Sequence, residues 1–534
     1  MVTRKITKSF RSNLVKTLLE TSAVRPLYVY YSRPNEYENG NGEVVPKVID
    51  SVLNENEIKA NMMSLKRIQR ADMIVGCRKI EWEQNKIYDQ YDDALNIKDL
   101  DYYVITDTHD VFKCISNGSK GPNDNPKESI HKPTRGILKY ADGYIWKFMF
   151  KVPQRTLRKF GFVNDIPIVE NNLAISSAVP GTLDRIDIIN TGEDYALLDA
   201  FGESEPLDYI PLYIKGDGES NESAKCDITV NNSNEITEIT INEEGSNYRI
   251  TTGKYTPVKI RQIEREIALG ENFEFAYGFA ELSPSGEILN IHVTSPGKGY
   301  VAGKVTISQS SAIAYGILNG GKVESIEVDY SGFDFSYCEI IPIFDAGINL
   351  QLKPVLSPYL GHGSNPIEEL NGDRLLINSR IALDENLDFT VENDFRKYGI
   401  ISDVKQFDSK NNIVPAFSSS LSAKESIFVK DLITVNIAED SIVYGKTSGA
   451  KAFLIDSING NELRVIRSYE TANSIPFIPD EEIKIMPGAF EFTIESTQKP
   501  EYVLQSGQIL YINNIEPIKR SDAQIESLNF SIKF

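Results

Sequence analysis

The chain has 534 residues, of which 41% are hydrophobic, and it carries a net charge of −20 at pH 7. This length and apolar content allow several domains with proper cores and exclude a disordered protein. A strongly acidic surface is unsuited to wrapping nucleic acid, because phosphates need a basic partner, so we expect no nucleic-acid partner.

The cysteines and apolar segments exclude further classes. Four cysteines are scattered without a paired motif: Cys77, Cys114, Cys226 and Cys338. This pattern signals neither a zinc knuckle nor a disulfide framework, and it favours free thiols made in a reducing cytoplasm. The N-terminus lacks the apolar stretch of a secretion signal, and no segment reaches the length of a membrane span. We therefore expect a soluble chain without a membrane partner.

Two helices are predicted near the N-terminus. The segment 5–20 should bury one face, because apolar residues recur every four positions, at Ile6, Phe10, Leu14 and Leu18. A strand at 27–31 follows. The second helix is predicted to run from an Asn54 cap to Met73, with a buried side formed by Ile58, Met62, Leu65 and Ile68.

Short strands dominate the rest of the chain outside its middle. They are predicted at 79–82, 102–106, 111–116, 144–152, 509–512 and 528–534, whereas 375–388 and 398–404 are predicted to mix strand and loop. The glycine- and proline-rich loop at 117–135 is either mobile or an interaction arm. The segment 418–422 is predicted to be a linker, and 427–492 a β module with a hairpin turn at Asn459-Gly460-Asn461.

The middle of the chain repeats one phrase four times. Each copy has two aliphatic residues at alternate positions, then a glycine, then an aromatic residue three positions after the glycine. The aliphatic pairs are Ile186/Ile188, Ile239/Ile241, Ile291/Val293 and Ile326/Val328, and the turns are Gly192/Tyr195, Gly245/Tyr248, Gly297/Tyr300 and Gly332/Phe335. The alternation predicts a half-buried strand, the glycine a tight turn and the aromatic a lid over the strand. Three copies are preceded by a further strand and a turn, which favours small β modules.

The residue types of the repeated phrase favour a structural role. The phrase contains no nucleophile, base or metal ligand. Asp194, Asp329 and Asp334 lie in or beside the turns and leave a structural calcium site open, although the EF-hand spacing is absent. The turn aromatics either cover the strands or bind sugars or protein partners.

Other candidate chemistry is weak. Gly445-Lys446-Thr447 resembles the end of a phosphate-binding loop, but Asp440 stands where that loop needs a glycine. The histidines His109, His131, His292 and His362 are far apart in sequence, and acidic pairs such as Asp92-Asp93 arise by chance among 76 acidic residues. We therefore predict no enzyme activity, no cofactor and no metal site.

One segment resembles a known family. Asp142-Gly143-Tyr144-Ile145-Trp146, in a strand ending at Pro153, is similar to a motif of the baseplate wedge subunit of T-even-like contractile-tailed bacteriophages, the product of their gene eight. Other segments resemble this family in the same order: Ile6 to Arg11 with Phe10, the strand 27–31 with Arg33-Pro34, Phe395-Arg396 before Ile400-Ile401, Gly507 with Tyr511 and Pro517, and the final Phe534. The resemblance covers about half of the chain, in the ranges 1–175, 360–410 and 500–534.

The resemblance implies a non-enzymatic wedge protein of the virion tail baseplate, made in the host cytoplasm. It implies a homodimer within each wedge, with other baseplate wedge proteins as partners. The residues assigned to the shared scaffold are Phe10, Arg11, Gly143, Tyr144, Trp146, Pro153, Gly507, Tyr511, Pro517 and Phe534, with Trp146 in a core. The repeats and the 427–492 module have no counterpart in the family and look like insertions. A further hypothesis gives the repeats a fibre or a peripheral subunit as partner.

The predicted fold is mainly β and multidomain, with antiparallel β-sandwich-like domains, a few short helices and inserted small β-repeat modules. The expected divisions are an N-terminal scaffold at 1–175, an inserted repeat region at 176–355, a scaffold segment at 356–415, a second insertion at 416–500 and scaffold strands at 501–534. Two alternatives stay open: a receptor- or glycan-binding tail adhesin that uses the aromatic turns, and a glycan hydrolase, which needs a carboxylate pair that the sequence does not single out.

Overall fold

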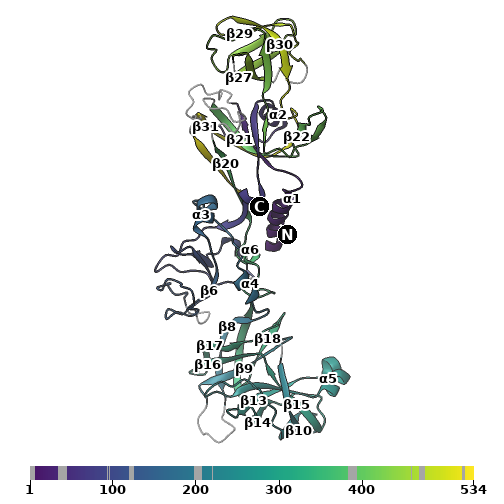
Figure 1. The fold of residues 1–534 in the computed structure, drawn as a ribbon. Coiled ribbons are helices and arrows are strands. Elements are labelled where there is room, and N and C mark those ends of the chain that lie inside the picture. Colours follow the sequence, from purple (N-terminus) through teal and green to yellow (C-terminus); the bar gives the residue numbers. More distant parts are fainter. Residues whose placement is uncertain are drawn as a thin grey trace. The chain divides into compact units, whose positions relative to one another are not determined.

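The computed structural model describes residues 7–33, 45–92, 94–95, 97–119, 125–197, 207–218, 220–382, 394–458, 460–467, 475–519 and 524–534 (Figure 1). In this part of the chain antiparallel strands dominate, and the helices are short. The predicted mainly β, multidomain fold is confirmed. The chain divides into two compact units. The first joins Met1–Gly76, Arg158–Phe162 and Asp373–Phe534, and the second joins Cys77–Leu157 and Val163–Gly372.

Two sheets form the centre of the first unit. One has the order β24-β2-β1-β21-β31, with strands at Ser420–Ser422, Met62–Arg67, Tyr28–Ser32, Asp394–Ser402 and Gln508–Lys519. In the other, β20 (Arg374–Ala382) lies between β32 (Ile525–Lys533) and β3 (Met73–Arg78). The ring of Phe530 in β32 lies 5.5 Å from that of Tyr398 in β21 and 5.7 Å from that of Tyr511 in β31. The two sheets therefore pack face to face, as in a β-sandwich.

Helix α1 (Lys8–Thr21) forms where the sequence predicts a helix, but the predicted buried face is wrong. Val15 and Leu19 are buried, whereas Phe10 is 59% exposed. The helix carries apolar residues on two neighbouring stripes, and the period of one stripe cannot decide which of them meets the rest of the unit. Ile6 lies outside the described residues.

The second predicted helix is mostly wrong. Helix α2 covers only Val52–Ala60, and its cap is Ser51, which accepts the Asn54 N–H. The following residues form β2, in which Leu65 pairs with Tyr30 of β1. The first four residues of β2 are all buried. A strand covered on both faces shows no alternation, so its apolar residues also fit a helical spacing, and the pairing with β1 decides the structure. A short 3₁₀ turn, η1 (Arg70–Asp72), follows.

The predicted linker at 418–422 is also wrong. It contains β24, which pairs with β2. A hairpin of β22 (Lys405–Phe407) and β23 (Ile413–Pro415) precedes it. Serine-rich composition suggested a linker, but three residues suffice for an edge strand when a partner strand is available.

The module predicted around 427–492 is a closed six-stranded barrel in the order β25-β28-β27-β26-β29-β30. In chain order its strands are Glu425–Val429, Ile442–Gly445, Lys451–Ile458, Glu462–Arg467, Glu482–Met486 and Phe490–Gln498. Aliphatic side chains fill it. Arg33 ties the barrel to the sheet that contains β1. Its Nε donates to Asp440 at 2.7 Å, and its guanidinium lies 3.7 Å from the centre of the Phe453 ring.

The second unit contains the three-stranded sheet β4-β5-β6 (Tyr103–Ile105, Asp110–Asn117 and Tyr144–Lys151), which confirms three predicted strands. The strand predicted at 79–82 is wrong, because β3 ends at Arg78 and only an isolated bridge joins Glu81 to Ile105 in the described chain. Other short elements described in this unit are η2 (Ile97–Asp99), β7 (Asp165–Pro167), α4 (Asn172–Ser176) and α6 (Pro366–Glu369), and the boundary of the unit falls within α3 (Gln154–Phe160).

The repeats fold into what we call the repeat arm, residues 183–356. Each copy is a three-stranded unit: a first strand, a second strand with the two aliphatic residues, and a third strand after the aromatic. Copies two to four are consecutive: β10 to β12 (Ser220–Val230, Ile236–Glu243, Thr256–Arg261), β13 to β15 (Ala276–Leu282, Ile288–Ser295, Gly303–Ser310) and β16 to β18 (Ala312–Asn319, Lys322–Ser331, Cys338–Pro342). In copy one, β8 (Leu183–Ala196) and β9 (Tyr209–Gly216) are the second and third strands. Its first strand, β19 (Ala346–Leu356), comes from the far end of the region.

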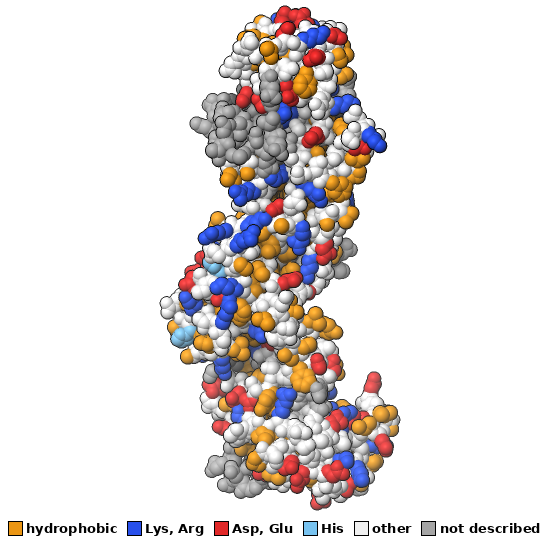
Figure 2. All heavy atoms as spheres, in the orientation of Figure 1, with side chains coloured by type: hydrophobic (Ala, Val, Ile, Leu, Met, Phe, Trp, Pro, Cys, Tyr) orange, Lys and Arg blue, Asp and Glu red, His pale blue; other side chains and the backbone are white. Residues whose placement is uncertain are grey.

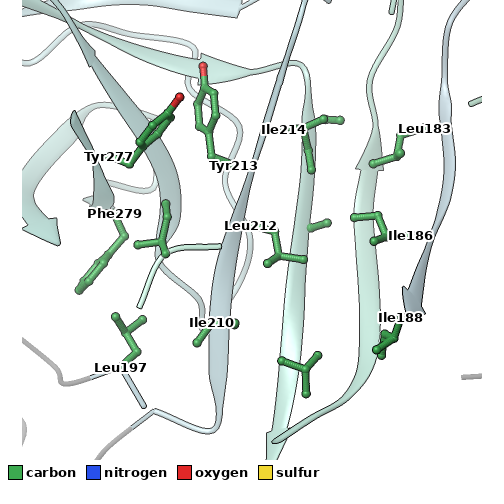
Figure 3. Packing of buried hydrophobic residues seen from close by; sticks show 14 of the residues in the cluster. Leu183, Ile186, Ile188, Leu197, Ile210, Leu212, Tyr213, Ile214, Tyr277 and Phe279 are labelled. Carbon is green, nitrogen blue, oxygen red and sulfur yellow. The ribbon is translucent and has the colours of Figure 1, made fainter. Parts of the chain in front are cut away.

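The copies associate in two pairs. Copies two and three form the inner pair, in which the third strand of each copy pairs with the first strand of the other. Ala224 of β10 lies opposite Ile307 of β15, and Ala276 of β13 lies opposite Ile260 of β12. Copies one and four form the outer pair, in which β9 pairs with β16, the first strand of copy four, and with β18, its third strand. Figure 3 shows alternate residues of β9, Ile210, Leu212 and Ile214, in the core of the outer pair.

Main-chain hydrogen bonds between paired copies repeat at equivalent places. The N–H of three turn aromatics donates to a carbonyl of the other copy in the pair: Tyr248 to Gly286, Tyr300 to Asn234 and Tyr195 to Gly321. The N–H of Phe335 donates to the carbonyl of Gly181, just before β8 of copy one. The two pairs are nested. The inner pair is inserted between β9 and β16, and the outer pair leaves and rejoins the chain at Thr182 and Ser357, which bond to each other. The antiparallel strands β8 and β19 form the stem of the repeat arm.

Candidate functional site

The segment that resembles the wedge family forms part of a core in the second unit. Trp146 of β6 is 1% exposed. Its ring stacks on that of Tyr144, with centroids 5.5 Å apart, and meets the Tyr88 ring edge-on. The Tyr144 hydroxyl accepts the Tyr88 N–H and donates to the Lys127 carbonyl. Trp146 therefore lies in a core, where the sequence analysis places it.

The turn before β6 requires a glycine. Gly143 has a φ of +91°, and a Cβ on it would lie 2.9 Å from the Cα of Gly118. The Asp142 carboxylate fixes the same turn by accepting the main-chain N–H groups of Ile130, His131 and Tyr144. The Asp-Gly pair of this motif therefore sets backbone geometry.

The predicted scaffold residues fall into both units. Phe10, Arg11, Gly507, Tyr511, Pro517 and Phe534 belong to the first unit, and Gly143, Tyr144, Trp146 and Pro153 belong to the second. Gly507 has a φ of +87° and lies against Ile401. The N–H of Phe534 donates to the carbonyl of Asp373. Pro153 is exposed before α3, and the side chain of Pro517 in β31 lies outside the described residues.

The four turns of the repeat arm share one backbone conformation. Gly192, Gly245, Gly297 and Gly332 have φ values from +64° to +70°, and the residue before each aromatic is also left-handed, at Asp194, Asn247, Gly299 and Asp334. A Cβ on Gly297 would lie 2.5 Å from the Glu274 carbonyl oxygen and 2.7 Å from the Tyr300 ring. Glycine is needed there because the aromatic folds back over it.

The turn tyrosines satisfy the backbone that they cover. The hydroxyls of Tyr195, Tyr248 and Tyr300 accept the N–H groups of Leu350, Ala224 and Ala276 at 3.2, 3.0 and 2.9 Å. In copy four, Phe335 has no hydroxyl, and the N–H of Ala312 donates to Ser310 Oγ at 3.3 Å instead. All four rings are buried. They cover strands, and their faces are not open to a sugar.

Charged side chains are buried at the base of the stem. Lys113 of β5 is fully buried, and its ammonium pairs with the carboxylate of Glu369 in α6, which is 2% exposed. His362 Nε2 lies 2.8 Å from both carboxylate oxygens of Asp184 in β8, and its Nδ1 lies 3.8 Å from Glu369. We call these four residues the root cluster.

Each strand of the stem is also tied to the segment 77–157 by a cation. Arg185 of β8 donates to the carbonyls of Tyr91 and Ile115, at 2.6 and 3.0 Å. Lys353 of β19 pairs with the buried carboxylate of Asp92. The arm is therefore held at its base by directional polar contacts.

The root cluster shifts the ionisation of its carboxylates. Burial raises the pKa of Glu369, but the charges and hydrogen bonds of Lys113 and His362 outweigh burial and lower this pKa to about 2. Burial likewise raises the pKa of Asp92, and the hydrogen bond and charge of Lys353 lower it overall. Both groups are ionised at neutral pH. Removing one partner of such a buried pair leaves an uncompensated charge, so the pairs hold one geometry.

The sequence analysis misses the root cluster. Its members are far apart in the chain: Lys113 and Glu369 are separated by 256 positions. One local signal was available, because Lys113 interrupts the apolar run from Val111 to Ile115. A lysine inside a strand that is buried on both faces needs an anionic partner.

A carboxylate explains the resemblance of Gly445-Lys446-Thr447 to a phosphate-binding loop. Glu481 accepts the N–H groups of Thr447 and Ser448 at 3.3 and 3.0 Å, and the Ser448 hydroxyl at 3.0 Å. The protein's own carboxylate therefore binds the N–H groups of this turn. This turn belongs to the barrel.

The described residues contain no group of three or more His, Cys, Asp or Glu side chains placed to hold a metal ion. In the same ranges, no helix has the length and apolarity needed to span a bilayer. The fold and the site define a class: a multidomain, mainly β protein whose nested repeat arm is fixed by buried ion pairs. No family model matches the chain, and no curated protein sequence matches it.

Proposed function

We propose that the chain is a structural baseplate wedge subunit of a contractile phage tail. It joins neighbouring wedge proteins during tail assembly and holds them through contraction. It acts in the virion as a homodimer within each wedge, without enzyme activity, cofactor or nucleic acid. The observation that carries the proposal is the ordered series of family-like segments along the sequence, with Asp142 to Pro153 as its most specific member.

The structure of these segments suits a scaffold. Trp146 and Tyr144 are buried core residues, and the Asp142-Gly143 turn is fixed by backbone contacts. Residues of this kind set geometry, and an assembly subunit works by holding other subunits in one geometry. No chemistry on a substrate is required for this work.

The repeat arm suits an attached adaptor. It leaves and rejoins the chain through paired strands, so it can be carried by a scaffold without altering the scaffold's order of strands. Buried ion pairs at its base fix its attachment. We propose that it meets a fibre or a peripheral subunit of the tail.

The adhesin alternative relied on exposed aromatic turns. The four turn aromatics are buried, so their rings do not form a surface that a sugar could contact. A glycan-binding role would need a different surface.

The test is to isolate a tagged copy of the full chain from infected cells and to identify its companions by mass spectrometry. Other tail wedge proteins at fixed stoichiometry are expected. Recovery of the chain alone, together with binding to envelope glycans of the host, would overturn the proposal.

A matched variant tests the role of the arm. An Asn-Gly turn replaces 197–345 and links Ala196 to Ala346, which pair in the stem, so the stem and the root cluster remain. The wedge proteins should still be recovered with this variant, while one fibre or peripheral protein should be lost. The same set of companions for both forms would show that the arm has no partner in the tail.

A further inference from the structure

One junction in the repeat arm differs from the other three. The third strand of a copy is joined to the next first strand by residues 217–219, 311 and 343–345 in three places. Between β12 and β13 the connection is 262–275, and it contains helix α5 (Ile263–Leu269) and the turn η3 (Gly270–Asn272). Because the pairing of copies works without such an insertion elsewhere, folding of the repeat does not explain it.

Side-chain hydrogen bonds hold helix α5 against the turn of copy three. Gln262 and Arg265 donate to the carbonyls of Val301 and Gly299, at 2.9 and 3.0 Å. Gly299 stands where the other turns have Asp or Asn, and a Cβ on it would lie 2.7 Å from Leu269 Cδ1. The turn of copy three is therefore adapted to carry α5.

The outer face of α5 is apolar with an acidic rim. Ile263 is 47% exposed and Ile267 is 79% exposed, and the two are four residues apart on one helical face. Glu264 and Glu271 are exposed beside them and form no ion pair within the described residues. In Figure 2 orange and red side chains gather in the region of α5 at the lower right. We call this surface the knob.

A complementary hollow lies in the segment 77–157 of the same unit. It is shallow and open to solvent, has a volume of about 620 Å³, and its lining includes Trp82, Ile130, Ile137, Tyr140, Lys132 and Lys139. Ile130 and Ile137 are 49% and 50% exposed. Its lining among the described residues includes these two lysines and no carboxylate. Lys132 also pairs with Asp107, a contact that is itself exposed.

We propose that the knob of one chain docks into the hollow of a second copy of this chain. The isoleucines enter the apolar hollow as in helix-in-groove recognition, and Glu264 and Glu271 meet Lys132 and Lys139. In this proposal each chain gives its knob to one neighbour and receives the knob of another, so the contact is heterologous and produces rings or longer arrays of copies. The inference goes beyond the proposed function, since it needs no tail protein other than this chain.

Sedimentation velocity of the full chain at rising concentration tests the proposal. Species larger than a closed dimer should form, and high salt should reduce them because the rim charges are exposed. Ile267→Ser, which changes no charge, should weaken this association by roughly tenfold or more. A chain that never exceeds a closed dimer would overturn the proposal and leave the wedge role untouched.

Charge reversal gives the sharper test. Glu264→Lys with Glu271→Lys makes the knob basic, and Lys132→Glu with Lys139→Glu makes the hollow acidic. Neither variant should associate alone, but a mixture should form assemblies in which the two kinds of chain alternate. Glu238→Lys with Glu324→Lys, on exposed positions of β11 and β17, is the matched control and should behave like the unmodified chain. Equal association by all variants would contradict the proposal.

Discussion

The inner and outer pairs of the repeat arm share one design but differ in how the chain passes through them. The inner pair is made of two consecutive copies. Equivalent residues have the same separation in sequence: Tyr248 follows Ala224, and Tyr300 follows Ala276, by 24 positions. The outer pair is interrupted in sequence. The first strand of copy one, β19, is the last strand of the arm along the chain, and the inner pair is inserted between β9 and β16. The stem of the outer pair meets buried charged groups outside the arm, through Asp184 and Lys353.

The difference separates two sources of stability. The inner pair depends on apolar packing and on the repeated turn, as an autonomous module does. The outer pair has the same turns and also a polar base that gives it one attachment. Both tryptophans, Trp82 and Trp146, lie in the second unit, so their fluorescence reports on the unit that contains both pairs.

The largest expected effect comes from the base of the outer pair. Lys113→Met leaves the Glu369 carboxylate buried without its cation and should lower the free energy of unfolding of the second unit by about 3–5 kcal/mol. Urea denaturation followed by tryptophan fluorescence measures the change. Lys113→Met with Glu369→Leu removes both charges and should regain much of the loss. A single variant as stable as the unmodified chain would show that the root cluster contributes nothing.

Low pH should destabilise the root cluster at the foot of the stem. The folded pKa of Glu369, about 2, lies below its ordinary value of 4.5, so its stabilising effect is fully present above pH 4.5 and is lost as the pH falls through about 2. The shift corresponds to about 3 kcal/mol. Denaturation midpoints between pH 5 and pH 2 should fall more steeply for the unmodified chain than for Lys113→Met with Glu369→Leu. Parallel curves would contradict this assignment.

Replacing the turn glycine by alanine should lower stability by the same amount in both pairs. Gly192→Ala in the outer pair and Gly297→Ala in the inner pair each combine a left-handed φ with a steric clash, and each should cost about 2–3 kcal/mol. Gly253 has a φ of +75°, and no atom lies within 4 Å of the position that an added methyl group would take, so Gly253→Ala should cost about 1 kcal/mol. Thermal and urea denaturation compare the three. If all three variants lost the same stability, contact with the aromatic ring would not be the cause of the larger loss expected at Gly192 and Gly297.

The smallest effect concerns the tyrosine hydroxyl. Tyr300→Phe removes the hydroxyl that accepts the Ala276 N–H and donates to the Ile260 carbonyl, and it should cost about 1–2 kcal/mol. In copy four, Ser310→Ala should cost about 1 kcal/mol, since Ser310 satisfies the equivalent Ala312 N–H. Adding Phe335→Tyr should then restore stability. Failure of that rescue, with an intact fold, would show that the copies are not equivalent at this contact.

Features that depend on residues close together in the sequence could be predicted from it. The four turns, the hairpins before three of them and the strand with Trp146 depend on residues a few positions apart, and the structure has them as predicted. The sequence could not show β19 as the first strand of copy one, because the intervening copies conceal the pairing. Nor could it show that Lys113 meets Glu369. The helix predicted over Met62–Arg67 is wrong because a strand buried on both faces and a helix can have the same apolar spacing.

The stem also determines how a force on the repeat arm would be borne. The chain enters and leaves the stem at the same end, at Thr182 and Ser357, so a pull on the far end of the arm divides between two covalent chains side by side. The hydrogen bonds of an antiparallel ladder run perpendicular to the strands, so this pull does not slide one strand past the other. Tension passes instead to Arg185 and Lys353, one on each strand, and from them into the segment 77–157.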